Sequence, residues 1–171
     1  MPHDFSPTRP DSPTRPASPT RPASGERPIT LQVRLCDHPL ELDPLWEAIA
    51  EEDAGAHLVF VGRTRRRTGQ RVTRKLVYEA FTPMAEAELQ RLLQEAAERH
   101  GLTAGVILHR LGEVAVGAAS IAVAVSSPHR RSSFAAVAWI MDMVKTRVPI
   151  WKQEAFEDGS QEWVHPQEQA P

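Results

Sequence analysis

The sequence has only one cysteine, Cys36, among its 171 residues. A single thiol cannot form an internal disulfide, and it cannot supply the several cysteines of a usual structural zinc site. Cys36 follows an alternating apolar run, residues 31–35, so we interpret it as a packed strand residue rather than as a nucleophile. An enzyme of this sequence that carried out sulfur chemistry would have to receive its sulfur from elsewhere.

The sequence also lacks a strong net charge and a long apolar segment. Its formal net charge is −2 at pH 7, which indicates neither a nucleic-acid nor a membrane partner. The most apolar windows, 120–125 and 135–144, are too short to span a bilayer or are interrupted by Asp142. The first residues lead into a proline-rich stretch, unlike a signal peptide. We therefore expect a soluble cytoplasmic protein with no membrane partner.

Several catalytic signatures are absent. No glycine-rich loop precedes Lys145-Thr146, which excludes a nucleotide P-loop, and no G-x-S-x-G motif occurs. The residues His57, His100 and His109 lack the spacing of metal ligands, and we interpret each as a surface or satisfied core histidine. The sequence predicts neither a metal site nor a cofactor.

Residues 1–28 differ in composition from the rest of the chain. The unit Ser-Pro-Thr-Arg-Pro occurs three times there, starting at Ser6, Ser12 and Ser18. Dense proline removes backbone donors, and few apolar side chains are present to form a core, which predicts a disordered tail. We assign a single folded domain to residues 29–165 and a short C-terminal tail to 166–171.

The domain mixes strands and helices without a regular βαβ alternation, which favours the α+β class. Asp43-Pro44 predicts a helix start, with Gly55 as its end, and two longer helices are expected at 82–100 and 130–147. A loop is predicted over 62–74 and a turn over 112–117. Apolar or alternating runs predict strands at 29–35, 57–61, 75–80, 106–111, 120–126, 150–156 and 162–164.

The apolar spacing of the two longer helices predicts which faces are buried. In the first, we expect an inward stripe of Ala85, Leu89, Leu92 and Ala96. In the second, the side chains expected to point inward are Phe134, Val137, Ala138, Met141 and Val144.

Two groups of residues could bind an anion or take part in catalysis. His129 and Arg130 open the second long helix, where unpaired N–H groups and charged donors suit a phosphate or carboxylate, although solvated arginines are the simpler alternative. Lys145 lies in the last turn of that helix, a position that the helix dipole alone explains. Lys152 follows Pro149 and Trp151, which predicts an ordered, partly buried turn; nearby cations or burial would lower its pKa.

A third group is the arginine-rich segment 63–75, in which seven of thirteen residues are basic. Nucleic-acid binding is one interpretation, but the segment lacks aromatic residues for base stacking. A phosphate- or carboxylate-binding loop fits equally well. For Arg66 and Arg67, a solvated position is the simplest interpretation.

Several of these segments together resemble the catalytic, large subunit of molybdopterin synthase, in order from about residue 29 to 164. The most specific is Met141-Asp142-Met143-Val144-Lys145-Thr146-Arg147-Val148-Pro149-Ile150-Trp151-Lys152-Gln153-Glu154. The others are Phe60-Val61-Gly62-Arg63-Thr64-Arg65, Leu76-Val77-Tyr78-Glu79-Ala80, His109-Arg110-Leu111-Gly112-Glu113 and His129-Arg130.

The resemblance implies an α/β-hammerhead-type fold and a sulfurtransferase of molybdenum cofactor biosynthesis. Such enzymes convert cyclic pyranopterin monophosphate to molybdopterin by installing two dithiolene sulfurs. The sulfur arrives as the C-terminal glycine thiocarboxylate of a small ubiquitin-like subunit. Two large subunits form a homodimer within a heterotetramer.

Carried over by motif, the resemblance implies that Lys145 and Lys152 are catalytic. The substrate-binding residues that it implies are Arg63, Thr64, Arg65, His129, Arg130, Lys145, Lys152, Gln153 and Glu154. On this interpretation Lys152 activates or orients the thiocarboxylate carbonyl, and Lys145 acts in proton transfer or transient covalent capture. Two alternatives are a non-catalytic anion- or nucleic-acid-binding module that uses the arginine segment, and a scaffold that only docks a ubiquitin-like tail.

Overall fold

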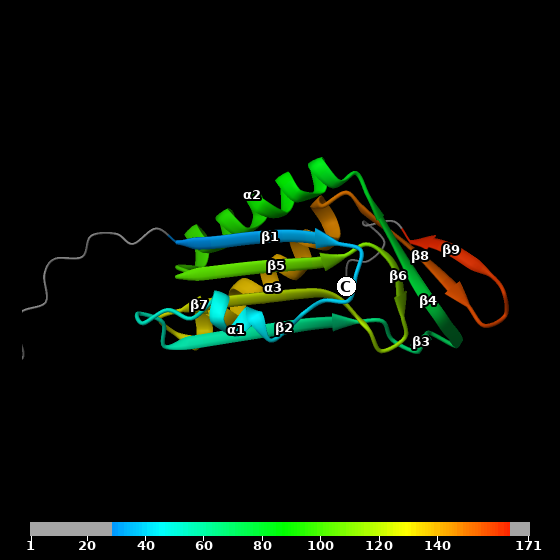
Figure 1. The fold of residues 1–171 in the computed structure, drawn as a ribbon, viewed down its shortest axis with the longest axis horizontal. Helices are drawn as coiled ribbons and strands as arrows, with labels where there is room; N and C mark the ends of the chain where they lie inside the picture. The colour runs from blue at the N-terminus through cyan, green and yellow to red at the C-terminus, as the bar shows by residue number, and fades with distance from the viewer. Residues whose placement is uncertain (1–28, 165–171) are drawn as a thin grey trace, which may run out of the picture.

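The computed structural model describes residues 29–164 (Figure 1). The predicted tails at 1–28 and 166–171 lie outside the described residues, so the structure does not test them. The helices are α1 (Pro44–Ala48), α2 (Thr82–His100) and α3 (Arg130–Arg147). The strands are β1 (Thr30–Cys36), β2 (Ala56–Arg63), β3 (Arg67–Thr68), β4 (Arg71–Ala80), β5 (Ala104–Arg110), β6 (Gly112–Ala115), β7 (Ala119–Ser127), β8 (Ile150–Phe156) and β9 (Gln161–Val164).

The first sheet has the strand order β1-β5-β7-β2 and carries helices on both faces. Strands β1 and β5 are parallel, and the other two pairs are antiparallel. Helices α2 and α3 lie side by side on one face, where the larger apolar core forms, and the short α1 lies on the other (Figure 1). Alternation divides β2, β5 and β7 between the two cores, so Val123 packs under the long helices while Ala122 packs under α1.

The second sheet has the strand order β3-β4-β8-β9, with β6 also paired to β4. It lies beyond one end of the first sheet, where α3 also ends (Figure 1). Strands β4 and β8 are antiparallel, and their register places Lys152 opposite Tyr78 and Glu154 opposite Leu76. Side chains from both sheets therefore meet where the two sheets adjoin.

Helix α2 confirms the sequence-based prediction in both its bounds and its buried stripe. Proline occupies its first turn, and Gly101 ends it in the left-handed conformation, φ +64°. The four predicted inward residues are all buried.

Helix α3 has the predicted bounds, but part of its predicted inward face is wrong. Val137 and Val144 are buried as expected, whereas Phe134 is 62% exposed and Ala138 is also exposed. The buried face is shifted onto Ser133, Ala136 and Ile140. Apolar residues lie on both sides of this helix, so composition alone placed the stripe incorrectly.

Three predictions of local structure are also wrong. Helix α1 ends at Ala48 instead of reaching Gly55. The N–H of Gly55 donates a hydrogen bond to the carbonyl oxygen of Ser127, and a Cβ at Gly55 would lie 2.5 Å from the carbonyl oxygen of Pro128. Close approach of two chain segments, and not a helix end, is therefore the reason for this glycine. Strand β4 begins at Arg71, inside the predicted loop, because a tight turn at Gly69 pairs it with β3. The predicted turn at 112–117 contains β6, which pairs with β4.

Within residues 29–164 we find no helix that is long and apolar enough to cross a membrane.

Candidate active site

A cavity of about 600 Å³ lies between the two sheets, beside the last turn of α3. Its walls come from α3 and from β2, β3, β4, β5, β7, β8 and β9, so no single segment of the sequence makes it. The lining residues are Phe60, Gly62, Arg63, Arg65, Thr68, Leu76, Tyr78, His109, Ser120, Ile121, Met141, Val144, Lys145, Ile150, Lys152, Glu154 and Val164.

Four cations predicted as site residues line this cavity: Arg63, Arg65, Lys145 and Lys152. They come from the end of β2 and the segment after it, the last turn of α3, and the middle of β8. The guanidinium of Arg63 is held by the carbonyl of Gly117 at 2.7 Å. Convergence of four cations on one hollow favours an anionic ligand such as a phosphate.

Lys152 lies in strand β8, within the strand predicted at 150–156, and not in the ordered turn that Pro149 and Trp151 suggested. Its side chain is half-buried, as expected. Burial lowers its pKa, and the nearby positive charges of Arg65 and Lys145 lower it further, while Glu154 opposes them. The pKa of Lys152 is thus lowered by burial and by two cations of the same cavity. A lysine in this environment has a larger neutral fraction than a solvent-exposed one, as a nucleophile or proton acceptor requires.

Glu154 is the one carboxylate among the residues that line the cavity, and it is 97% buried. Its Oε1 accepts hydrogen bonds from the hydroxyls of Thr68, at 2.7 Å, and of Thr73. Residues two apart on a strand share a face, so Glu154 and Lys152 both face the cavity while Gln153 points to the opposite side. Gln153, a predicted substrate-binding residue, therefore does not line this cavity.

Thr64 is buried between its two arginine neighbours, but it does not line the cavity. Its hydroxyl oxygen has no hydrogen-bond partner among residues 29–164. The predicted arginine segment is thus divided in function, with Arg63 and Arg65 at the cavity and Thr64 packed behind them.

The other arginines of the segment lie away from the cavity. Arg71 pairs with Glu162 and lies over the ring of Phe156, 3.4 Å from its centroid, so it connects strands of the second sheet. Arg66 and Arg67 are exposed, as the sequence analysis expected.

His129 and Arg130 lie far from the two lysines. Because α3 has 18 residues and each adds about 1.5 Å, its two ends are about 26 Å apart. His129 and Arg130 are exposed at the N-terminal end and line a separate hollow with Arg99 and Phe134. Within one chain they cannot reach a small molecule that is bound at Lys145.

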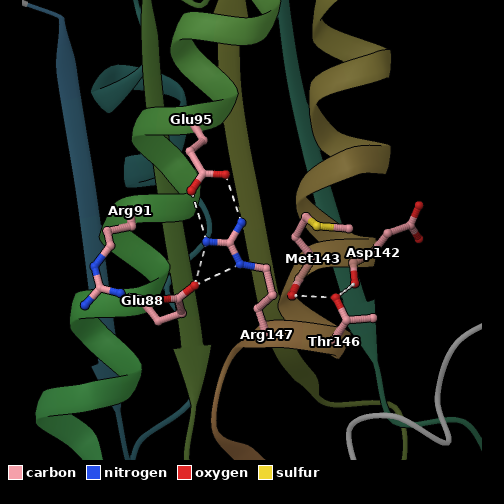
Figure 2. Close-up of polar contacts among 7 residues, drawn as sticks. All are labelled: Glu88, Arg91, Glu95, Asp142, Met143, Thr146 and Arg147. Carbon is pink, nitrogen blue, oxygen red and sulfur yellow. Dashed lines mark hydrogen bonds and ion pairs between the residues drawn. The ribbon is translucent and has the colours of Figure 1, made fainter.

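The C-terminal end of α3 is tied to α2 by Arg147 (Figure 2). Its guanidinium donates to both carboxylate oxygens of Glu95, at 2.8 and 3.0 Å, and its Nε donates to Glu88 at 2.9 Å. These bonds raise the pKa of Arg147 and lower the pKa of Glu95. Arg147 therefore points towards α2, and it positions the last turn of α3, which carries Lys145 into the cavity.

Among the lining residues that were not predicted as site residues are Tyr78, His109 and Ser120. The rings of Tyr78 and His109 meet edge to face, with centroids 5.0 Å apart. Burial raises the pKa of Tyr78, while a side-chain hydrogen bond with Ser120 opposes that shift. The sequence analysis interpreted His109 as a surface or satisfied core histidine, because a strand pattern does not distinguish a cavity wall from the core.

Among the described residues, no group of three or more His, Cys, Asp or Glu could hold a metal ion. Cys36 lines a different hollow, beside α1. The cavity therefore offers cations, one carboxylate, three hydroxyls and an imidazole for chemistry on an anionic substrate.

Comparison with known proteins agrees with this geometry. The family described as MoaE protein matches residues 35–147. The chain is 38% identical over 135 residues to the molybdopterin synthase catalytic subunit of Emericella nidulans, covering 79% of this chain and 69% of that protein. It is 39% identical over 123 residues to the protein of the same name from Pyrococcus abyssi, covering 72% and 82%.

Solved structures are also similar. The crystal structure of molybdopterin synthase from Staphylococcus aureus matches with a TM-score of 0.71 and 34% identity, covering 76% of this chain and 94% of that chain. A complex of subunits 1 and 2 of the molybdopterin-converting factor from Helicobacter pylori matches at a TM-score of 0.62 with 20% identity, which supports the fold alone. The family match and the curated relatives lead to one conclusion: the chain belongs to the MoaE protein family, as its sequence motifs indicated.

Proposed function

We propose that this protein is the catalytic subunit of a cytoplasmic molybdopterin synthase. It transfers sulfur from the C-terminal thiocarboxylate of a small ubiquitin-like subunit to cyclic pyranopterin monophosphate, and so forms the dithiolene of molybdopterin. The observation that carries the proposal is the convergence of Lys145 and Lys152 with Arg63 and Arg65 on one cavity. The names of the curated relatives support the same assignment.

The cations have complementary roles in this reaction. Arg63 and Arg65 bind the phosphate and, with the lysines, stabilise the negative charge that develops on leaving oxygens. Lys152, with its lowered pKa, activates or orients the thiocarboxylate carbonyl. Lys145 acts in proton transfer or transient covalent capture. Cys36 lies outside the cavity, which fits a sulfur atom that is delivered by the partner.

The distance between the ends of α3 bears on the quaternary structure. His129 and Arg130 contribute to this reaction only if a second copy of the chain brings them to the cavity. We therefore include a homodimer of large subunits in the proposal, each site combining Lys145 and Lys152 of one copy with His129 and Arg130 of the other. The exposed Phe134 beside Arg130 is an apolar surface that such a contact would cover.

The decisive experiment mixes the protein with a thiocarboxylated small subunit and cyclic pyranopterin monophosphate and measures dithiolene product. We expect Lys145→Ala and Lys152→Ala each to abolish most of the product. Lys75→Ala is the matched control, because Lys75 pairs with Glu113 and does not line the cavity; it should retain normal activity.

Three outcomes would contradict the proposal in different ways. Normal product formation by Lys152→Ala would remove the assigned role of that lysine. Binding of the small subunit without turnover by the wild-type protein would favour a scaffold. Salt-dependent nucleic-acid binding that depends on residues 65–74 and not on Lys152, with no product, would favour a binding module.

A further inference from the structure

His109 places two ring nitrogens in different surroundings at the wall of the cavity. The side chain projects from β5 and is 5% exposed, and it lines the cavity together with Tyr78. Its Nδ1 lies 3.0 Å from the carbonyl oxygen of Arg110. A carbonyl oxygen only accepts hydrogen bonds, so Nδ1 carries a proton and donates it. The edge-to-face contact with the ring of Tyr78 fixes the orientation of the imidazole.

The second nitrogen, Nε2, is left as an acceptor. Burial lowers the pKa of His109 from 6.5 to about 4, so the ring is neutral at neutral pH. A neutral ring with its proton on Nδ1 has an unprotonated Nε2 with a free lone pair. No side chain or backbone group of residues 29–164 forms a hydrogen bond with this atom.

The four cations around the cavity cannot act as acceptors. Arg63, Arg65, Lys145 and Lys152 are donors that suit the oxygens of a phosphate. The carboxylate of Glu154 accepts two threonine hydroxyls at Oε1, and its negative charge would oppose that of a phosphate-bearing ligand. A substrate that carries N–H or O–H donors on a ring, as well as a phosphate, needs an acceptor that is buried and unoccupied.

We infer that His109 Nε2 is the hydrogen-bond acceptor by which the cavity recognises a ring N–H or O–H of its heterocyclic substrate, separately from the phosphate. The inference rests on the proposed function and adds a specificity-determining residue to it. Because the imidazole is so weakly basic, its role is recognition rather than proton abstraction. A ligand without the donor would leave Nε2 buried and unpaired, which is how a polar site rejects an analogue.

Two substitutions separate recognition from packing. Asparagine places its amide near the position of Nδ1, so His109→Asn keeps a donor to Arg110 O and has no atom at Nε2. Glutamine reaches the position of Nε2 with its amide oxygen, so His109→Gln restores an acceptor. Calorimetric titration should be run with cyclic pyranopterin monophosphate and, separately, with inorganic phosphate.

We expect His109→Asn to weaken binding of the pterin monophosphate by about tenfold, as loss of a hydrogen bond worth about 1.4 kcal/mol predicts, and to leave phosphate binding unchanged. His109→Gln should recover most of the affinity. Wild-type affinity in His109→Asn, or equal weakening in both variants, would overturn the inference.

A measurement on the wild-type protein avoids any effect of substitution on folding. With 15N-labelled histidine, the Nε2 resonance of His109 should shift towards its protonated position when the pterin monophosphate binds, and it should not shift with inorganic phosphate. An unchanged resonance in the bound state would also overturn the inference. If the wild-type protein bound phosphate but not the pterin monophosphate, the proposed function would fail, and the inference with it.

Discussion

Replacing Thr73 with valine tests how the buried carboxylate of the cavity is held. Thr73 is 2% exposed and Glu154 is 3% exposed, and the threonine hydroxyl donates a hydrogen bond to Oε1 of the carboxylate. Valine has nearly the same shape but lacks the donor. The hydrogen bond to a charged group contributes roughly 1.5–3 kcal/mol, and the remaining bond from Thr68 compensates in part. We therefore expect Thr73→Val to lower the free energy of unfolding by about 2 kcal/mol.

Urea denaturation at pH 7 measures this change. With a slope of about 2 kcal/mol per molar urea, the midpoint should fall by about 1 M. Thr68→Val is the matched control: it removes the other donor to the same oxygen, but Thr68 is more exposed, so water can replace the lost hydroxyl. Its effect should be smaller, about 1 kcal/mol. An unchanged midpoint for Thr73→Val, or a larger effect for Thr68→Val, would refute the reasoning.

Two further predictions concern the composite site and Lys152. Arg130→Ala and Lys152→Ala should each be inactive alone. Mixing the two variants under conditions that exchange subunits should restore part of the activity, because a mixed dimer has one intact site. If the subunits exchange and no activity returns, shared sites are excluded. Burial lowers the pKa of Lys152 in the folded chain. At a pH between that lowered pKa and 10.5, the unfolded chain therefore binds a proton that the folded chain does not, and the free energy of unfolding of the wild type rises with pH over this range. Lys152→Met should therefore be more stable than the wild type at pH 7, with the difference vanishing above pH 10.5; a constant difference in urea denaturation from pH 7 to 11 would contradict this.

The helices and most strands could be predicted from the sequence because local signals set them. Pro83 and Gly101 delimit α2, and the three- and four-residue spacing of its apolar side chains fixes the buried face. Strand β6 and the start of β4 were missed because their pairing partners decide their conformation: β6 exists through its ladder with β4. Helix α3 shows the same limit, since Phe134 is as apolar as its buried neighbours and only the sheet beneath determines that it faces outward.

The candidate site could be predicted where a residue type itself indicates the chemistry. Lysines and arginines in a specific motif identify Lys145, Lys152, Arg63 and Arg65, and all four line one cavity. His109 carries no such signal, because a histidine in an apolar strand has the same sequence pattern in a core as in a cavity wall. Only the hydrogen bond of Nδ1 to a carbonyl and the position of the ring at the cavity wall distinguish the two cases.

The position of His129 and Arg130 shows what a single-chain sequence cannot encode directly. A motif lists residues in order along the chain, and it contains no record of which copy of the chain supplies each one. The length of α3 supplies that information: a rigid helix of 18 residues keeps its two ends apart in any conformation of one subunit. If both ends serve one phosphate-bearing substrate, the helix acts as a spacer between two sites. Each copy then provides the lysines of one site and the histidine-arginine pair of the other, which makes assembly a condition for activity.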